Sequence, residues 1–152
     1  MVQGDGRRLP IRTGVMNAAY CIGAPSIVGL RPALAELTRV VRPGGRVIVS
    51  DITWHEQPGP LGREWGWAAA AAQTSTDHYV DELTSVGLLV DRVVMHDREA
   101  WDQYWQPLRV VADDARSAGD TAFADETQQL IDMERRAVDA WLDYTTFIAV
   151  RP

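Results

Sequence analysis

One block constrains the fold more than any other: a helix signal that runs through a turn into a strand signal. The segment RPALAELTRVVRPGGRVIVSD extends from Arg31 to Asp51. Its apolar residues recur at helical spacing, and Pro32 suits the first turn of a helix. Pro43-Gly44-Gly45 ends that helix, and the β-branched run from Arg46 to Ile52 is typical of a buried strand. The block therefore predicts a helix that packs beside a buried strand.

The rest of the chain continues this alternation of strands and helices. Strand signals, which repeat at period two or form short apolar runs, lie within 14–25, 46–52, 88–96 and 144–152. The run within 14–25 predicts a buried strand followed by a loop. Helix signals cover 31–45, 65–72, 75–87, 98–117 (interrupted at Pro107) and 121–142. This order predicts an α/β fold with a mainly parallel sheet and helices on both faces. The last strand follows a helical pair, so we expect it to run antiparallel near an edge.

Two of the predicted helices carry finer signals. Ser75 or Thr76 caps the start of the helix over 75–87, and Gly87 suits its C-terminal end. In the last helix, a set of apolar residues is predicted to share one face: Phe123, Leu130, Ile131, Val138, Trp141 and Leu142.

Length and charge limit the classes of function. At 152 residues, the chain 1–152 is expected to form one domain. The formal net charge is -6 and the basic residues are scattered, so we expect no nucleic-acid partner. The single cysteine, Cys21, excludes an internal disulfide and fits a reducing cytoplasm. No apolar run is long enough to span a bilayer, so no membrane partner is expected.

Four blocks in order resemble one enzyme family. ALAELTRVVRPGGRVIVSD is similar to the helix, Pro-Gly-Gly turn and fifth strand of class I S-adenosylmethionine (SAM) dependent methyltransferases, especially the small-molecule, quinone-biosynthesis-like (type 11) branch. GDGRRLPIRTGVMNAAYCIGA resembles the stretch that leads into the fourth strand. YVDELTSVGLLV resembles the helix before the sixth strand, and TTFIAVRP resembles the last, antiparallel strand. The resemblance implies strands four to seven of a Rossmann-like sheet, with a helical insertion before the last strand.

The resemblance also implies what the sequence lacks. The family's Gly-rich SAM loop, and the acid that holds the ribose hydroxyls, belong before Met1. The QGDG at Gln3 to Gly6 does not replace that loop, because it matches a later block and no strand precedes it. We therefore expect the C-terminal portion of the family domain, with an incomplete cofactor site.

The resemblance assigns a first set of residues to SAM. Asp5 matches the acid that accepts a hydrogen bond from the adenine amino group, and Gly6 supplies backbone to the adenine edge. The segment past the methionine part of SAM consists of Cys21, Ile22, Gly23 and Ala24. It lies at the carboxyl end of a parallel strand, where open α/β sheets bind ligands. The alternatives are a solvated Asp5 in a frayed terminus and a Cys21 that is only a small core residue.

A second set of residues is expected to face a small-molecule methyl acceptor. His55 is the candidate general base, because its ordinary pKa of about 6.5 lets it accept a proton near neutrality; the alternative is an exposed histidine without a role. His78 and His96 are weaker candidates. Together with Asp51, the aromatic residues expected at the acceptor are Trp54, Trp65, Tyr79 and Trp105. Aromatic walls suit a flat or apolar acceptor. For most of these aromatic residues, ordinary packing is the alternative, and the histidine spacing predicts no metal site.

Two main functions of different classes remain open on the sequence, and a third alternative is a nucleotide-binding α/β domain of another class, against which the missing Gly-rich loop counts equally. The first is SAM-dependent methyl transfer to a small molecule. The second is a non-catalytic methyltransferase-like domain that acts by association. A fourth strand left at the sheet edge would invite pairing with a second copy, as a homodimer, or with a partner chain.

Overall fold

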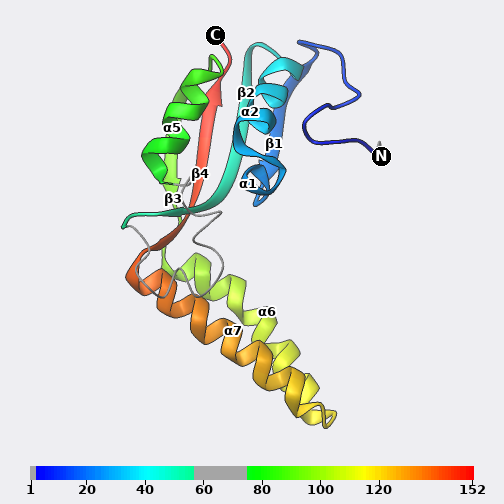
Figure 1. The fold of residues 1–152 in the computed structure, drawn as a ribbon, viewed down its shortest axis with the longest axis vertical. Coiled ribbons are helices and arrows are strands. Elements are labelled where there is room, and N and C mark those ends of the chain that lie inside the picture. Colours follow the sequence, from blue (N-terminus) through cyan, green and yellow to red (C-terminus); the bar gives the residue numbers. More distant parts are fainter. Residues whose placement is uncertain (1–2, 57–74) are drawn as a thin grey trace.

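The computed structural model describes residues 3–56 and 75–152. Within these residues, the order of elements along the chain is β1 (Met16–Ile22), α1 (Pro25–Val28), α2 (Leu30–Val40), β2 (Val41–Trp54), α5 (Thr76–Ser85), β3 (Leu89–Met95), α6 (Arg98–Ser117), α7 (Thr121–Ala140) and β4 (Leu142–Val150). Figure 1 shows a sheet flanked by α2 and α5, with the hairpin of α6 and α7 extending away from one end of the strands. The helix predicted over 65–72 lies outside the described residues.

The four strands form a mixed sheet in the order β1-β2-β4-β3. β1 pairs parallel with β2, whereas β4 runs antiparallel to both β2 and β3. The α/β fold class and the antiparallel last strand are therefore confirmed. β4 lies one place in from the β3 edge, because it inserts between β2 and β3.

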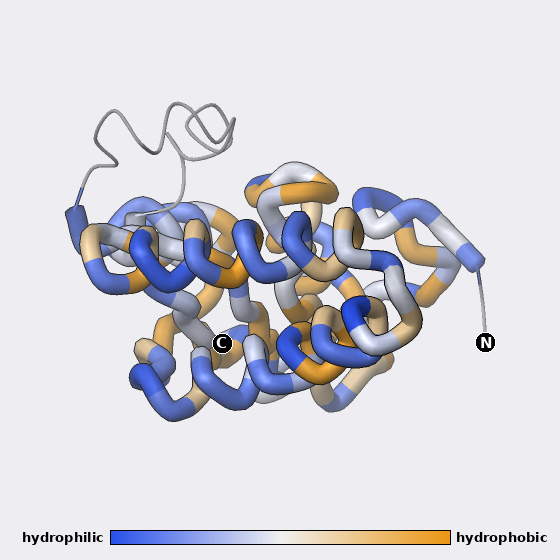
Figure 2. Tube along the Cα trace, turned by 90° about the horizontal axis from the view of Figure 1, so that it is seen from below, coloured by the Kyte–Doolittle hydropathy of each residue, from blue (hydrophilic) through white to orange (hydrophobic). Residues whose placement is uncertain are grey.

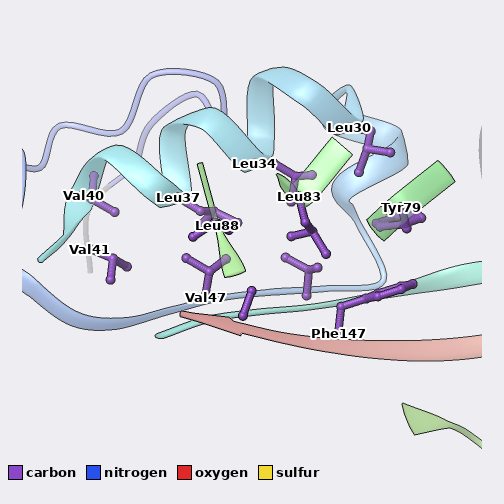
Figure 3. Packing of buried hydrophobic residues seen from close by; sticks show 12 residues of the cluster. Leu30, Leu34, Leu37, Val40, Val41, Val47, Tyr79, Leu83, Leu88 and Phe147 are labelled. Atoms are coloured by element: carbon purple, nitrogen blue, oxygen red, sulfur yellow. The ribbon is translucent and has the colours of Figure 1, made fainter. Parts of the chain in front are cut away.

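α2 and α5 cover one face of the sheet and form the main core with it. Figure 3 shows their apolar side chains above the strands, with Leu34 and Leu83 facing Val47 and Phe147. These side chains are fully buried. The helical spacing predicted for α2 is thus the pattern that buries it. Ser75 caps α5 as expected, since its hydroxyl accepts from the His78 N–H.

A second core lies where α6 and α7 meet the opposite face of the sheet. Side chains alternate between the two faces of a strand, so Ile52 and Tyr144 point away from α2 and α5. Both pack against a cluster that includes Trp101, Trp105 and Ile131. Figure 2 shows hydrophilic and hydrophobic turns alternating along the helical tubes, as amphipathic helices require. Helices therefore contact both faces, as predicted.

Three details of the sequence prediction are wrong. Pro107 does not interrupt its helix: α6 is continuous through it, and Pro107 is exposed, so water can satisfy the carbonyl group that loses its partner. In α7, Phe123 is 46% exposed, because the buried stripe runs instead through Ala124, Thr127, Ile131, Glu134 and Ala137. The strand β1 is mostly exposed rather than buried, because β2 is its single neighbour in the described sheet.

Candidate functional site

A cavity of about 530 Å³ lies where the sheet meets the helical hairpin. Its walls come from the ends of β1 and β2, the start of β4, the residue after β3, and both hairpin helices. The lining residues are Gly23, Ile52, His96, Ala100, Trp101, Tyr104, Glu134, Leu142 and Tyr144. The carboxyl ends of the parallel strands β1 and β2 meet here, which is the edge at which open α/β sheets bind ligands.

Gly23 brings the backbone that follows β1 to the wall of this cavity. Its φ is +64°, a conformation that favours glycine, and its N–H donates to the Ser50 carbonyl at 2.7 Å. A Cβ atom at Gly23 would lie 3.4 Å from the Tyr144 hydroxyl. The missing side chain therefore leaves room between the turn after β1 and the tyrosine on β4.

Two hydrogen bonds fix the polar groups on the sheet side of the cavity. The Tyr144 hydroxyl and the Ser50 hydroxyl lie 2.7 Å apart, and the His96 Nε2 lies 2.9 Å from the Thr146 hydroxyl. The His96 and Tyr144 rings also contact each other, with centroids 5.4 Å apart. These groups are therefore positioned by the sheet before any ligand arrives.

The helical side of the cavity carries one carboxylate. Glu134 on α7 is 8% exposed, and it accepts a hydrogen bond from the Trp105 indole N–H at 2.9 Å. Burial raises the pKa of Glu134, and the indole hydrogen bond offsets part of that rise. A carboxyl group held this way binds a proton or a ligand cation more readily than an exposed one.

Aromatic rings surround this carboxylate. Trp101 stacks on Trp105 with centroids 5.5 Å apart, and it meets both Tyr104 and Tyr144 edge-on, at 6.0 and 6.2 Å. Such offset and T-shaped pairs are favoured by the ring quadrupoles. The pKa of Tyr104 is raised by burial and by the nearby Glu134 charge. The cavity is thus a set of aromatic walls with few polar groups.

The predicted SAM residues lie in β1, directly after it, and in the segment 5–6 near the start of the chain. Gly6 packs against α1, where a Cβ atom would meet the Val28 Cγ1 at 3.2 Å. Asp5 is exposed, and hydrogen bonds from the Arg7 side chain and main chain lower its pKa. Gly6 therefore lies beside α1, which directly follows the predicted segment of Cys21, Ile22, Gly23 and Ala24. Gly23 is the member of this set that lines the cavity.

The predicted acceptor residues are divided between the cavity region and the main core. Tyr79 is fully buried and donates its hydroxyl hydrogen to Asp51 at 2.6 Å, and Asp51 also accepts from the Ser26 N–H. Burial is the largest cause that raises the pKa of Tyr79, and the hydrogen bond to Asp51 raises it further. Neither side chain lines the cavity, because odd-numbered β2 residues point toward α2 and α5.

The remaining predicted acceptor residues lie around the second core. Trp105 and Trp54 pack in it, behind the cavity lining. His55 lies at the end of β2 with its Nδ1 3.0 Å from the Asp143 carboxylate, and its side chain is 44% exposed. Trp65 lies outside the described residues. Of this predicted set, the structure places Trp54, Trp105 and His55 near the sheet end that holds the cavity.

Four lining residues with polar groups were not among the predicted site residues: Glu134, Tyr144, Tyr104 and Trp101; His96 was predicted only as a weaker candidate base. A signal for Glu134 does exist in the sequence. Glu134 lies three residues after Ile131 and three before Ala137, so it interrupts a buried apolar stripe with a carboxylate. Tyr144 and His96 lie next to each other because β3 pairs with β4. This strand order cannot be predicted from a local sequence pattern.

Among residues 3–56 and 75–152, no group of three or more His, Cys, Asp or Glu side chains is arranged to hold a metal ion. None of the helices in the described part of the chain has the length and apolar character needed to cross a membrane.

Comparison with curated proteins gives one kind of relative, although no protein-family model matches the chain. A demethylmenaquinone methyltransferase from Mycolicibacterium gilvum (strain PYR-GCK) is 40% identical over 53 residues, which is 34% of this chain. The aligned part spans 23% of that relative's length. This likeness supports the predicted resemblance to small-molecule methyltransferases of the quinone-biosynthesis-like branch.

Comparison with solved structures covers nearly the whole chain. The Haemonchus contortus phosphoethanolamine N-methyltransferase 2, solved with phosphomonomethylethanolamine and S-adenosylhomocysteine, aligns with a TM-score of 0.81 at 12% identity, over 97% of this chain and 36% of its own. A SAM-dependent methyltransferase from Geobacter sulfurreducens aligns with a TM-score of 0.72 at 20% identity, over 99% of this chain and 64% of its own. The [4+2]-cyclase SpnF aligns with a TM-score of 0.69 at 19% identity, over 98% of this chain and 54% of its own.

These comparisons confirm the resemblance and the Rossmann-like methyltransferase fold. The chain spans less than two thirds of the length of each of these proteins. The cyclase among the neighbours also shows that this fold hosts more than one reaction. The reaction of this chain must therefore be argued from its site.

Proposed function

We propose that the chain forms the acceptor side, and part of the cofactor side, of a SAM-dependent methyltransferase that acts on a small molecule. The observation that carries this proposal is the position of Gly23. It belongs to the segment that the family resemblance assigns to the methionine part of SAM, and it also lines the aromatic cavity. A methyl group presented at this turn would face a ligand in the cavity.

The residues at the end of β1 fit part of SAM. Gly23 has a positive φ and no side chain, so its backbone can approach a ligand closely. Gly6, which lies beside α1, and Asp5 are proposed for the adenine, where the Asp5 carboxylate would exchange its Arg7 partner for the adenine amino group. Cys21, Ile22 and Ala24 would contribute backbone on either side of Gly23.

SAM, when bound, supplies a methyl carbon to which the acceptor's lone pair bonds while the carbon–sulfur bond breaks and sulfur keeps the electron pair. The chain's own contribution is to hold the acceptor in line and exclude water, which can supply much of the rate. His55 is the proposed proton acceptor, with Asp143 orienting its ring. Because His55 does not line the cavity, this role needs the reacting atom to lie at the cavity's edge.

A complete cofactor site needs groups that this chain does not show. None of its 152 residues matches the Gly-rich loop or the ribose acid that the family resemblance implies. We therefore propose that the site is completed by chain outside this sequence or by a partner, and that these 152 residues alone bind SAM weakly.

Calorimetric titration with S-adenosylhomocysteine tests this proposal. Gly23→Val places a branched side chain against the Tyr144 hydroxyl and forces a β-branched residue into positive φ. We expect it to weaken binding by about tenfold or more. The control is Gly119→Val, which imposes the same strain at φ +88° in the turn between α6 and α7. Absence of binding at about 5 mM, or equal affinities in both variants, would contradict the proposal.

One observation favours a second function, in which the domain acts by association. β1 ends the described sheet, and Tyr20 and Ile22 on it are 64% and 59% exposed. An apolar edge of this kind is a template for pairing with a second copy or a partner chain. Light scattering after size exclusion discriminates the two: a stable monomer that binds S-adenosylhomocysteine supports methyl transfer, and a dimer that does not bind it supports association.

A further inference from the structure

The described lining of the cavity beside Gly23 carries a negatively charged group and no lysine or arginine. Among the lining residues that the structure describes, Glu134 is the one with a carboxylate. His96 is the one lining residue that could carry a positive charge, and its Nε2 is engaged with the Thr146 hydroxyl. The walls around Glu134 are otherwise aromatic or aliphatic, so little inside the cavity compensates a negative charge.

Glu134 itself lacks an ionic partner within the described part of the chain. Its hydrogen bond comes from the neutral indole of Trp105, and its side chain is buried. The two guanidinium groups that lie over the Trp105 ring have acidic partners of their own: Arg98 pairs with Asp139, and Arg135 lies 4.0 Å from Asp102. A buried carboxylate without a counter-ion is costly, and that cost falls when a cation binds beside it.

The aromatic groups of the cavity suit the same kind of ligand. Trp101 meets Tyr104 and Tyr144 edge-on, so the three rings enclose the space from different directions. Ring faces attract an ammonium or alkylammonium group by their quadrupole, by about 0.5–2 kcal/mol per contact. The molecule already shows this preference nearby, where the Arg98 and Arg135 guanidinium groups lie 5.6 and 5.5 Å from the Trp105 ring centroid.

We infer, resting on the methyl-transfer function proposed above, that the cavity selects an acceptor that carries an amine or ammonium group, with Glu134 as its counter-ion and Trp101, Tyr104 and Tyr144 as its aromatic walls. Among the described lining residues, an anionic acceptor would meet the Glu134 carboxylate and neither a lysine nor an arginine. A neutral, flat acceptor would satisfy the aromatic walls but would leave Glu134 without a counter-ion. The raised pKa of Glu134 agrees with this assignment, because a bound cation would favour the ionised form and so oppose the effect of burial.

A charge series of probes with one shape tests the assignment. Choline, 3,3-dimethyl-1-butanol and 3,3-dimethylbutanoate share a branched head of nearly the same volume and carry charges of +1, 0 and −1. Each is titrated into the protein up to about 50 mM at constant ionic strength, with binding followed by NMR chemical shifts. We expect choline to bind about tenfold more tightly than the alcohol, and the carboxylate to bind more weakly than either.

Glu134→Gln is the matched variant, because an amide oxygen can still accept the Trp105 hydrogen bond. We expect it to abolish the preference for choline while the affinity for the alcohol stays unchanged, which also shows that the cavity is still formed. Glu126→Gln, an exposed position on the same helix, is the control and should preserve the preference. Equal binding of choline and the alcohol by the wild type would overturn the assignment, as would a preference that survives in Glu134→Gln or a failure of choline to bind.

The titration with S-adenosylhomocysteine separates this assignment from the proposed function. Binding of S-adenosylhomocysteine without any charge preference in the cavity would leave the methyltransferase proposal intact and overturn the amine acceptor. A preference for choline without binding of S-adenosylhomocysteine would support a cation site and contradict methyl transfer by this chain.

Discussion

The buried carboxyl of Glu134 makes the stability of the hairpin depend on pH. Its ordinary pKa is 4.5, and burial raises it in the folded protein. The folded state therefore holds this proton more strongly than the unfolded state. The free energy of unfolding should fall as the pH rises from about 4.5 through the folded pKa, because the folded state must then ionise a buried group.

The measurement is urea unfolding of the wild type and of Glu134→Gln between about pH 4.5 and 8. We expect the variant to gain stability relative to the wild type as the pH rises, since glutamine does not titrate. Glu36 provides the opposite sign: hydrogen bonds from Arg39 lower its pKa, so it stabilises the fold above its unfolded pKa and loses that effect as the pH falls. A constant difference between wild type and Glu134→Gln would show that Glu134 does not titrate in this range.

Single residues differed in how far the sequence could place them. Gly23 was predicted from its position after a strand within a family-like block, and the structure puts it on the cavity wall. Tyr79 was predicted at the acceptor because aromatic residues follow the fifth strand. It instead fills the main core, where its ring stacks on Phe147 at 4.7 Å. The sequence indicates that aromatic residues cluster. Which of the two cores a ring joins depends on the face of the strand or helix from which its side chain points.

The proline within α6 gives a test at the level of one helix. Pro107 has no N–H to donate to the carbonyl four residues earlier, and it lies on the exposed side of a 20-residue helix. Pro107→Ala restores that hydrogen bond and should raise the free energy of unfolding by about 1–3 kcal/mol. Thermal unfolding followed by circular dichroism measures the change.

A fall in stability for Pro107→Ala would mean that the proline ring supports a bend which the hairpin requires. The matched control is Gln106→Ala at the neighbouring exposed position, which replaces one good helix former by another and should change stability by a few tenths of a kcal/mol.

Helix existence followed from the sequence, whereas the buried face and the continuity of the hairpin helices did not. Because Phe123 and Leu130 are large and apolar, the pattern in α7 predicts that both are buried. In the structure they are 46% and 40% exposed. The buried stripe instead uses small and polar residues such as Ala124 and Thr127, since two helices packed closely leave little room between them. The hydrophobic periodicity therefore predicts that α7 is a helix, whereas close packing against α6 determines which of its faces is buried.

At the level of the whole molecule, the residue after β4 ties the last strand to α2. The Arg151 guanidinium donates hydrogen bonds to the carbonyl groups of Thr38, Arg39 and Val41, at 2.9, 3.2 and 2.6 Å. These carbonyls lie at the C-terminal end of α2, where helix carbonyls lack helical partners. Arg151→Ala should lower the free energy of unfolding by about 1–3 kcal/mol, because hydrogen bonds to charged groups are lost.

Urea unfolding of Arg151→Ala measures this loss. Arg116→Ala is the control: Arg116 forms exposed ion pairs with Asp113 and Asp125 at the far end of the hairpin, and such pairs contribute about 0–1 kcal/mol. Equal effects of the two substitutions would show that the link between β4 and α2 adds nothing beyond a surface charge.

The end of the α6–α7 hairpin that joins the sheet also determines how far the opposite end can move. α6 and α7 have 20 residues each, so each is roughly 30 Å long, and they join the sheet through the cluster around the cavity. A rotation of about 5° at that junction would carry the turn at Gly119 through roughly 3 Å. Because the cavity lies at that junction, any change in hairpin orientation on ligand binding would be largest at the far turn, where a spectroscopic label on Ser117 would detect it.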